Sequence, residues 1–292
     1  MKRLALGDVT IDRIVELEGP GYEPEYFFPD STPDAWAAQM DWLAPHFFDV
    51  KANAYLRSIQ CYVVRTKHHT VLVDACVGNS KPRPSTPLWN GLTSDWLAQL
   101  ARAGVHPEEI DFVLCTHLHA DHVGWNTRLE DGRWVPTFPN ARYVFHKDEV
   151  RHWREHGETL TGPGTADSCF EDSVLPVIAA GKADLVGNDF GIDDALTIVP
   201  TPGHSPGHFC VDVRAHAGRT VLAGDVVHHP IQVAHPEWNS RFCIDPAQAR
   251  ATRRRFVETH ADTGTVILAA HFATPTAGRI IGNGPRCKFV VG

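Results

Sequence analysis

The sequence at residues 117–122 is His-Leu-His-Ala-Asp-His, and it comes one residue after a short apolar run, Phe112–Cys115. Alternate residues of an extended segment point to the same side, so His117 and His119 can hold one ion while Leu118 points into the core. Asp121 and His122 follow closely, and imidazole nitrogen and carboxylate oxygen are both good zinc ligands. The segment therefore predicts a metal site at the carboxyl end of a buried strand.

The same arrangement, a buried strand followed by a residue that can bind metal, recurs further along the chain. The apolar runs 196–199, 221–222 and 266–268 come before His204, Asp225 and His271, respectively. A single histidine at such a position is more often a structural residue than a ligand. Four such strand ends in one chain favour a metal site whose ligands come from distant positions in the sequence.

The remaining segments predict a mixed αβ chain. Residues 4–17 and 59–74 alternate or run apolar, and the second range has the form of a hairpin. We expect helices at 94–104, at 147–156 after a strand at 143–145, and from Asp245, an N-cap followed by a proline. No repeat or low-complexity linker divides the chain, which predicts a single domain over residues 1–292.

Residues from about 20 to 57 contain Pro, Gly and many aromatic residues, among them Tyr22, Phe27, Trp36 and Phe47. This composition predicts an inserted flap. Two interpretations stay open: a packing segment on the surface, or a lid over a substrate.

Composition narrows the functional classes. The net charge is −8 without a long basic run, which disfavours a nucleic-acid partner. No stretch approaches the roughly 20 apolar residues of a membrane span, and the N-terminus has no signal-peptide core. The seven cysteines form no CxxC pair, which indicates reduced, buried thiols. We expect a cytoplasmic enzyme that acts on a small molecule, with no nucleic-acid or membrane partner and with a homodimer left open.

Five segments together give the sequence a family resemblance. They are Leu-Val-Asp at 72–74, His-Leu-His-Ala-Asp-His at 117–122, Thr-Pro-Gly-His-Ser-Pro-Gly-His at 201–208, Ala-Gly-Asp at 223–225 and Ala-Ala-His at 269–271. In order and spacing they resemble the metallo-β-lactamase superfamily, over about residues 55–275. The resemblance implies an α/β fold, an αββα sandwich of two mixed sheets flanked by helices.

The resemblance also implies two divalent transition-metal ions at one edge of that sandwich. Zinc is favoured, while Mn²⁺, Co²⁺ and Fe²⁺ stay open. Asp74 would support the ligands without binding the ions. By analogy, the first ion is held by His117, His119 and His204, the second by Asp121, His122 and His271, and Asp225 bridges them.

The chemistry that the resemblance implies is hydrolysis by a metal-bridging hydroxide, with Asp121 passing a proton to the leaving oxygen. Trp125-Asn126 and His228-His229-Pro230 resemble the branch of acyl-homoserine lactonases, pyridoxolactonases and methyl parathion hydrolases. We therefore expect a lactone or carboxylic ester as substrate. A phosphotriester hydrolase, a thioesterase and a non-catalytic metal-binding sensor remain as alternatives.

One position departs from that branch. The homoserine lactonases carry a tyrosine three residues beyond the bridging aspartate, where this chain has His228. We expect His228 to be catalytic, donating a hydrogen bond to the oxygen that becomes negative in the transition state. A role in packing the loop or in supporting Asp225 is the alternative.

Residues 203–207 also satisfy the G-x-S-x-G pattern of a serine hydrolase. That reading requires an N–H from the residue after the serine, but Pro206 has none. It also requires a following helix, whereas residues 209–213 alternate as a strand does. Ser205 is therefore predicted to be a turn residue.

The other histidines and a basic run are interpreted as surface residues without a functional role. We expect His152 and His156 to share a solvated helix face, although their spacing can bind metal. The remaining residues expected at the surface are His68, His69, His216, His260 and the run Arg253–Arg255.

Overall fold

The computed structural model describes residues 3–156, 169–282 and 284–292. The chain divides into two compact units. Unit 1 contains Leu17–Ser58 and Asp194–Gly292, and unit 2 contains Lys2–Glu16 and Ile59–Asp193. A compact unit need not be a separate domain, so the single domain over residues 1–292 stays a prediction.

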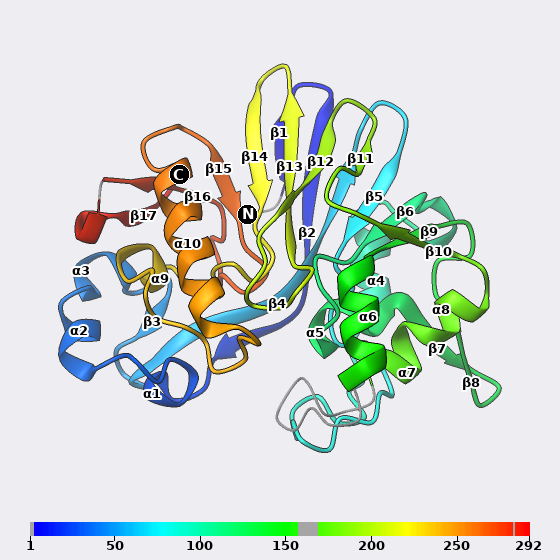
Figure 1. The fold of residues 1–292 in the computed structure, drawn as a ribbon, viewed down its shortest axis with the longest axis horizontal. Coiled ribbons are helices and arrows are strands. Elements are labelled where there is room, and N and C mark those ends of the chain that lie inside the picture. Colours follow the sequence, from blue (N-terminus) through cyan, green and yellow to red (C-terminus); the bar gives the residue numbers. More distant parts are fainter. Residues whose placement is uncertain (1–2, 157–168, 283) are drawn as a thin grey trace. The chain divides into compact units, whose positions relative to one another are not determined.

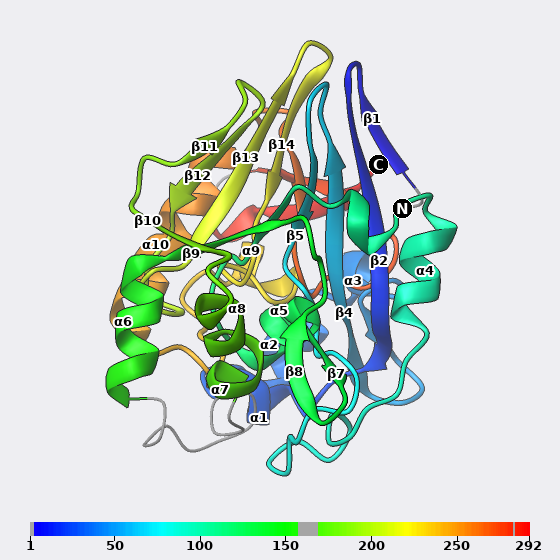
Figure 2. The ribbon, with the colours of Figure 1, turned by 90° about the vertical axis from the view of Figure 1, so that its right-hand side faces the viewer.

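The first sheet has the strand order β1-β2-β4-β5-β6-β9-β10, with β3 paired to β4. Strands β5, β6 and β9 are parallel, with Leu72 registered to Val113 and Val113 to Tyr143. Figure 2 shows β5 and β9 of this sheet. Their carboxyl ends therefore lie at one edge of the sheet. Asp74 follows β5 at this edge, and the 117–122 segment comes shortly after β6. The strands are β1 (Arg3–Leu6), β2 (Val9–Pro20), β3 (Phe48–Asp49), β4 (Ala54–Arg65), β5 (Thr70–Val73), β6 (Phe112–Leu114), β9 (Arg142–His146) and β10 (Ala183–Val186).

Unit 2 contains both helices that the sequence predicts for this part of the chain. The helix expected at 94–104 is α4, and the one expected at 147–156 is α6, which buries Val150 and Trp153 and exposes His156. The elements are α4 (Trp96–Arg102), η1 (Pro107–Glu109), α5 (Ala120–Val123), η2 (Gly124–Asn126), the hairpin β7 (Thr127–Glu130) and β8 (Arg133–Pro136), α6 (Lys147–His156), α7 (Cys169–Ser173) and α8 (Leu175–Ala179).

The second sheet has the order β11-β12-β13-β14-β15-β16-β17. In unit 1, β14 and β15 are parallel, with Leu222 registered to Leu268 (Figure 1). The loops that carry Asp225 and His271 consequently start side by side. The strands are β11 (Gly191–Ile192), β12 (Leu196–Pro200), β13 (Phe209–Ala215), β14 (Gly218–Leu222), β15 (Val266–Leu268), β16 (Gly278–Ile281) and β17 (Lys288–Val291).

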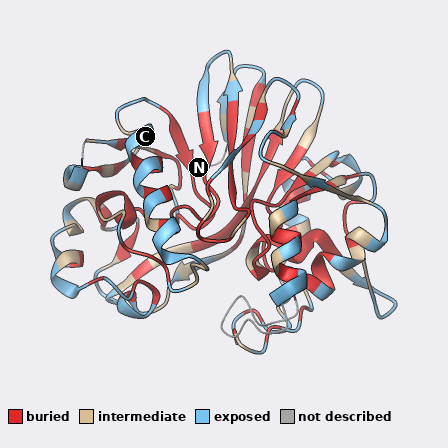
Figure 3. Ribbon diagram, in the orientation of Figure 1, coloured by how far each residue is buried: buried red, intermediate tan, exposed pale blue. Residues whose placement is uncertain are grey.

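The long helix of unit 1 begins as its sequence predicts. The Asp245 side chain accepts a hydrogen bond from the backbone N–H of Gln248 at 2.9 Å, and Pro246 occupies the first turn. Figure 3 shows exposed residues along this helix. The helical elements of the unit are α1 (Pro24–Phe27), α2 (Pro33–Ala37), α3 (Met40–Leu43), α9 (Ile231–Ala234), α10 (Pro246–His260) and η3 (Gly284–Arg286).

Two surface predictions on α10 are wrong. Arg253 is 1% exposed and His260 is 7% exposed, whereas Arg254 and Arg255 are exposed as expected. The reason is the helical period, because residues seven apart share a face and this face also buries Phe256. A basic run on a helix cannot be assigned to solvent as a block.

The aromatic segment from about 20 to 57 belongs to the packed core of unit 1. Phe28, Trp36 and Phe47 are buried, and the Trp36 ring lies 5.3 Å from that of His229. Burial of aromatic rings at this spacing supports the packing interpretation of the segment. Its role as a lid stays a prediction.

The prediction of free thiols is confirmed. All seven cysteines are free, and all but Cys243 are buried. In the part of the chain that the structure describes, no helix has the length and apolar character needed to cross a membrane.

Candidate functional site

The two histidines at the start of the 117–122 segment lie against each other in unit 2. His117 Nε2 is 3.0 Å from His119 Nδ1, and both rings are buried. Leu118, between them, is fully buried, and its N–H donates to Glu149 Oε2 at 3.1 Å. The prediction that the histidines share one side while Leu118 points into the core is confirmed.

Asp121 and His122 complete the cluster from the short helix α5. The His122 ring centroid lies 4.0 Å from that of His117, and His122 Nε2 is 3.8 Å from Asp121 Oδ1. The Asp121 carboxylate is the more exposed of the two side chains. Unit 2 therefore brings all four predicted ligands of this segment together.

Asp74 supports this cluster from the end of β5. Its Oδ2 lies 2.9 Å from His122 Nδ1, and its Oδ1 accepts from the N–H of Thr116 at 2.8 Å. An imidazole that donates from Nδ1 to a carboxylate presents the lone pair of Nε2 to a metal. The Thr116 hydroxyl lies 3.1 Å from His117 Nδ1, a contact that the sequence analysis did not assign.

The second cluster, in unit 1, surrounds one carboxylate oxygen with three imidazoles. Asp225 Oδ2 lies 3.4 Å from His204 Nε2, 3.3 Å from His228 Nε2 and 3.2 Å from His271 Nε2. All four side chains are buried. Two loops that are distant in the sequence, those of His204 and His271, therefore converge on the loop that carries Asp225 and His228.

The donor set of this second cluster fits a divalent transition metal. His204, Asp225 and His228 each offer one ligand atom within 4.8 Å of the others. Two ligand atoms about 2.1 Å from one zinc ion at a tetrahedral angle are roughly 3.4 Å apart, which matches the nitrogen-to-oxygen distances around Asp225. Nitrogen and carboxylate ligands suit zinc and its neighbours in the first transition row.

Two further side-chain contacts fix this cluster. His271 Nδ1 lies 2.9 Å from the carbonyl oxygen of Ser58, which again leaves Nε2 for a metal. The Asp225 N–H donates to His208 Nε2 at 2.8 Å, and His208 Nδ1 lies 2.7 Å from the Thr201 hydroxyl. His208 thus supports Asp225. The sequence patterns assign no role to His208, although Gly-His occurs twice in residues 203–208.

His228 lies beside Asp225 in an apolar setting. Burial lowers the pKa of His228 below its usual value, although Asp225 acts in the opposite direction. Its Nε2 is also 3.3 Å from the Ser240 hydroxyl, and its backbone N–H donates to Gln232 Oε1 at 2.6 Å. Among the described residues, its Nδ1 has no hydrogen-bond partner. Burial therefore favours the neutral form of the ring, and Nδ1 remains available as a hydrogen-bond donor.

Ser205 has the surroundings of a turn residue. Its carbonyl oxygen accepts from the backbone N–H groups of Gly203 at 3.0 Å and His208 at 3.4 Å. Its hydroxyl is buried, without a hydrogen-bond partner in the part of the chain that the structure describes. A serine nucleophile needs a hydrogen-bonded base, so this geometry agrees with the sequence interpretation.

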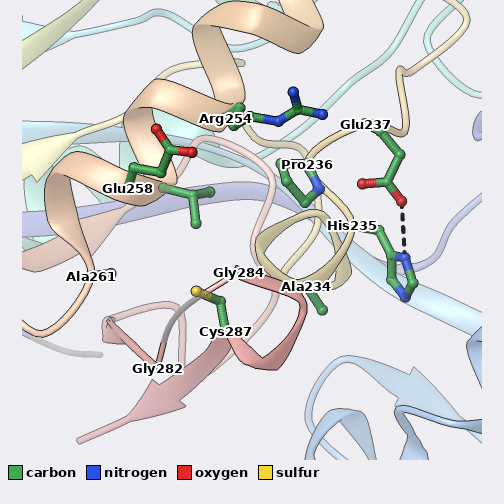
Figure 4. Close-up of a pocket in the computed structure, with 11 residues that line it drawn as sticks. Ala234, His235, Pro236, Glu237, Arg254, Glu258, Ala261, Gly282, Gly284 and Cys287 are labelled. Carbon is green, nitrogen blue, oxygen red and sulfur yellow. Dashed lines mark hydrogen bonds and ion pairs between the residues drawn. The ribbon is translucent and has the colours of Figure 1, made fainter.

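A cavity of about 550 Å³ lies elsewhere in unit 1, between α10, α9 and the residues Gly282, Gly284 and Cys287 (Figure 4). Its lining includes Val257, Arg254 and Cys287, and His235 Nδ1 contacts Glu237 Oε1 at 3.1 Å. None of the predicted ligands lines it. This cavity is therefore separate from the candidate metal ligands of the unit.

Comparison with known proteins gives three findings. The family model of the metallo-beta-lactamase superfamily matches residues 54–271. The chain is 22% identical over 176 residues to an N-acyl homoserine lactonase of Bacillus thuringiensis, and 26% identical over 170 residues to the N-acyl homoserine lactonase AttM of Rhizobium radiobacter. These matches cover 56% of the chain and 61% and 60% of the two relatives, so the similarity spans about three fifths of each relative's length.

Solved structures agree over nearly the whole chain. The hydrolase AbOPH of the beta-lactamase superfamily superimposes with a TM-score of 0.80 at 24% identity, covering 99% of this chain and 96% of the other. The dizinc quorum-quenching lactonase AidC gives a TM-score of 0.78 at 19% identity, with 100% and 97% covered. At such identities the likeness establishes the fold alone, and the family model matches well over half of the chain. The chain therefore belongs to the metallo-beta-lactamase superfamily and has its mixed αβ fold.

Proposed function

We propose that the chain is a dinuclear metal-dependent hydrolase that cleaves a lactone or another carboxylic ester. The observation that carries this proposal is the convergence of three buried imidazole Nε2 atoms within 3.4 Å of Asp225 Oδ2. The family match, residues 54–271, contains every predicted ligand. In the proposal the first ion is held by His117, His119 and His204, the second by Asp121, His122 and His271, and both by Asp225.

Bound at these residues, two such ions would supply Lewis-acid activation of a water nucleophile and of the scissile carbonyl group. The side chains of this chain do the rest. Asp121, the least buried ligand, would accept the proton that the attacking water loses and pass it to the leaving oxygen. His228 donates an N–H to the substrate oxygen that becomes negative, and a neutral, buried imidazole suits that role. Asp74 and His208 hold His122 and Asp225 in position.

The names of the relatives support the proposed substrate class. Those at 22% and 26% identity are named N-acyl homoserine lactonases, and the AidC structure is that of a lactonase with a product bound. His228 stands where a tyrosine is expected in those enzymes, so we propose the class, a lactone or carboxylic ester, without assigning an N-acyl homoserine lactone as the substrate. We further propose zinc as the metal. The seven free thiols support a reducing compartment such as the cytoplasm.

The test is metal content together with a substrate panel. Elemental analysis should find close to two equivalents of transition metal per chain. A panel of lactones, aryl esters, thioesters, β-lactams and phosphotriesters should show turnover of lactones or aryl esters, lost on chelation and regained on adding metal. A folded preparation that never loads beyond one ion contradicts the dinuclear proposal.

The panel also separates the alternatives. Cleavage of thioesters or phosphotriesters alone would keep the metal site and change the substrate class. Two bound ions without turnover of any panel member would favour a metal-binding sensor over an enzyme.

A further inference from the structure

Helix α10 buries one positive charge. Arg253 is 1% exposed and is among the largest fully buried side chains, whereas the next residues, Arg254 and Arg255, are exposed. Burying a guanidinium is unfavourable unless its N–H groups find acceptors. The identity of those acceptors therefore indicates what the buried arginine does.

The oxygen acceptors of Arg253 belong to the 226–239 loop, the part of the connection between β14 and α10 that also contains the short helix α9. Its Nε donates to the carbonyl oxygen of Val226 at 2.9 Å, and its Nη1 donates to those of Pro236 at 2.9 Å and Trp238 at 2.8 Å. Both Nη atoms lie 3.3 Å from Asn239 Oδ1. Among the described residues, no carboxylate pairs with Arg253. The charge is thus stabilised by backbone dipoles of the loop.

The same loop carries two residues of the proposed site. Val226 directly follows Asp225, so the bond to its carbonyl fixes the chain next to that carboxylate. The carbonyl oxygen of Trp238 also accepts from Gln232 Nε2 at 2.8 Å, and Gln232 Oε1 accepts from the N–H of His228. Arg253 therefore restrains both Asp225 and His228 through a continuous set of hydrogen bonds.

The adjoining turn of α10 contacts the loop that carries His204. The Thr252 hydroxyl donates to the carbonyl oxygen of Pro202 at 2.7 Å. Gly203 has φ of +128°, and a Cβ there would lie 2.3 Å from Ala249 N, so only glycine allows the loop this close to the helix. Cys243 Sγ lies 3.8 Å from His204 Nδ1 and 4.0 Å from Arg253 Nη2.

We propose that Arg253 is a positioning residue for metal binding: its guanidinium holds the 226–239 loop so that Asp225 and His228 are in place before an ion arrives. This inference rests on the proposed function of the site. If the loop is already ordered, metal binding does not have to pay the entropic cost of ordering it, and the affinity for the metal ion is higher. Arg253 itself touches neither ion nor substrate.

The test uses Arg253→Met, which keeps the length and removes the donors, and Arg253→Lys, which keeps the charge. Arg255→Met, on the exposed side of α10, is the matched control. We expect affinity for Zn²⁺, measured by competition with a chromophoric chelator, to fall roughly 10–100-fold in both Arg253 variants, as for other residues that support ligands. The d–d absorption of the Co²⁺-loaded protein should change in both, and neither quantity should change in Arg255→Met.

Melting of the metal-free proteins separates positioning from general stability. A folded Arg253 variant with wild-type Zn²⁺ affinity and Co²⁺ spectrum overturns the inference, even if its Tm is lower. If Arg253→Met does not fold, Arg253→Lys decides by the same readouts. If the wild-type protein binds two ions but cleaves no substrate of the panel, the proposed hydrolase function is contradicted. The comparison of Zn²⁺ affinities still tests the role of Arg253 in that case.

Discussion

The two clusters of predicted ligands are built in different ways. In unit 2, four ligands lie within six consecutive residues, 117–122, directly after β6. In unit 1, His204, Asp225 and His271 come from three loops after three strands. The first cluster obtains the spacing of its ligands from the chain itself, and Asp74 and Glu149 support it from other elements of unit 2. The second needs contacts that are distant in sequence, and these include a buried arginine.

The buried cations of the two units show the same contrast. In unit 2, Arg83 forms two bonds to Asp172, of 2.6 and 2.9 Å, and Lys81 Nζ lies 3.6 Å from the same carboxylate. In unit 1, Arg253 binds carbonyl oxygens. A cation paired with a carboxylate fixes one side chain, whereas a cation bound to several carbonyls fixes a loop. In our proposal Arg253 on α10 restrains the second cluster through such a loop, whereas Glu149 on α6 supports the first cluster through one side chain.

The largest expected effect tests whether the two clusters act as one. His119→Ala removes a ligand of unit 2 and Asp225→Ala one of unit 1. Each change should lower kcat/KM by about 10³-fold or more, because residues that act as a unit fail together. The double variant should then be hardly worse than either single variant. Steady-state kinetics and metal content of the three proteins measure this.

The contradictory outcome is additivity. If the two losses multiply in the double variant, or if one substitution leaves both activity and metal content intact, the clusters are independent. Lys67→Met, at an exposed position of unit 2, is the control and should keep the activity and metal content of the wild type.

The next effect concerns His228, the member of the second cluster that the family resemblance does not assign as a ligand. His228→Ala should lower kcat by roughly 10²–10³-fold with metal content unchanged, the magnitude for loss of a preorganised donor. Loss of metal in this variant would instead assign His228 to holding the ion or Asp225. Full activity with full metal would leave it without either role.

How much the sequence predicts differs between the two clusters for a physical reason. The 117–122 segment and the ends of β12, β14 and β15 are local patterns, so the sequence alone predicts them and their strands. Register and burial depend on what packs on each residue. Arg253, as part of a basic run, gives no sign of burial, and His208 gives no sign that it faces Asp225. Supporting contacts form across long separations, and a single sequence does not show them.

A smaller effect is expected in the pH dependence of stability, through the buried amine of Lys81. Burial lowers the pKa of Lys81 to about 7, against a usual value near 10.4 in an unfolded chain. Between these values the unfolded chain binds more protons, so stability should rise with pH. The free energy of unfolding of wild type relative to Lys81→Met should increase by on the order of 1 kcal/mol per pH unit between pH 7 and about 10. Urea unfolding at several pH values measures it, and a constant difference would show that Lys81 stays charged.

The smallest expected effect concerns Ser205, in the loop that carries His204. Ser205→Ala should change kcat/KM by less than about twofold, because its hydroxyl has no hydrogen-bond partner in the described part of the chain and Pro206 offers no N–H for an oxyanion hole. Thr201→Val is the matched comparison, since the Thr201 hydroxyl contacts His208, which accepts from the Asp225 N–H. That change should weaken metal binding measurably. If Ser205→Ala abolished turnover while both ions stayed bound, the serine would be the nucleophile, and the metal cluster around Asp225 would need another explanation.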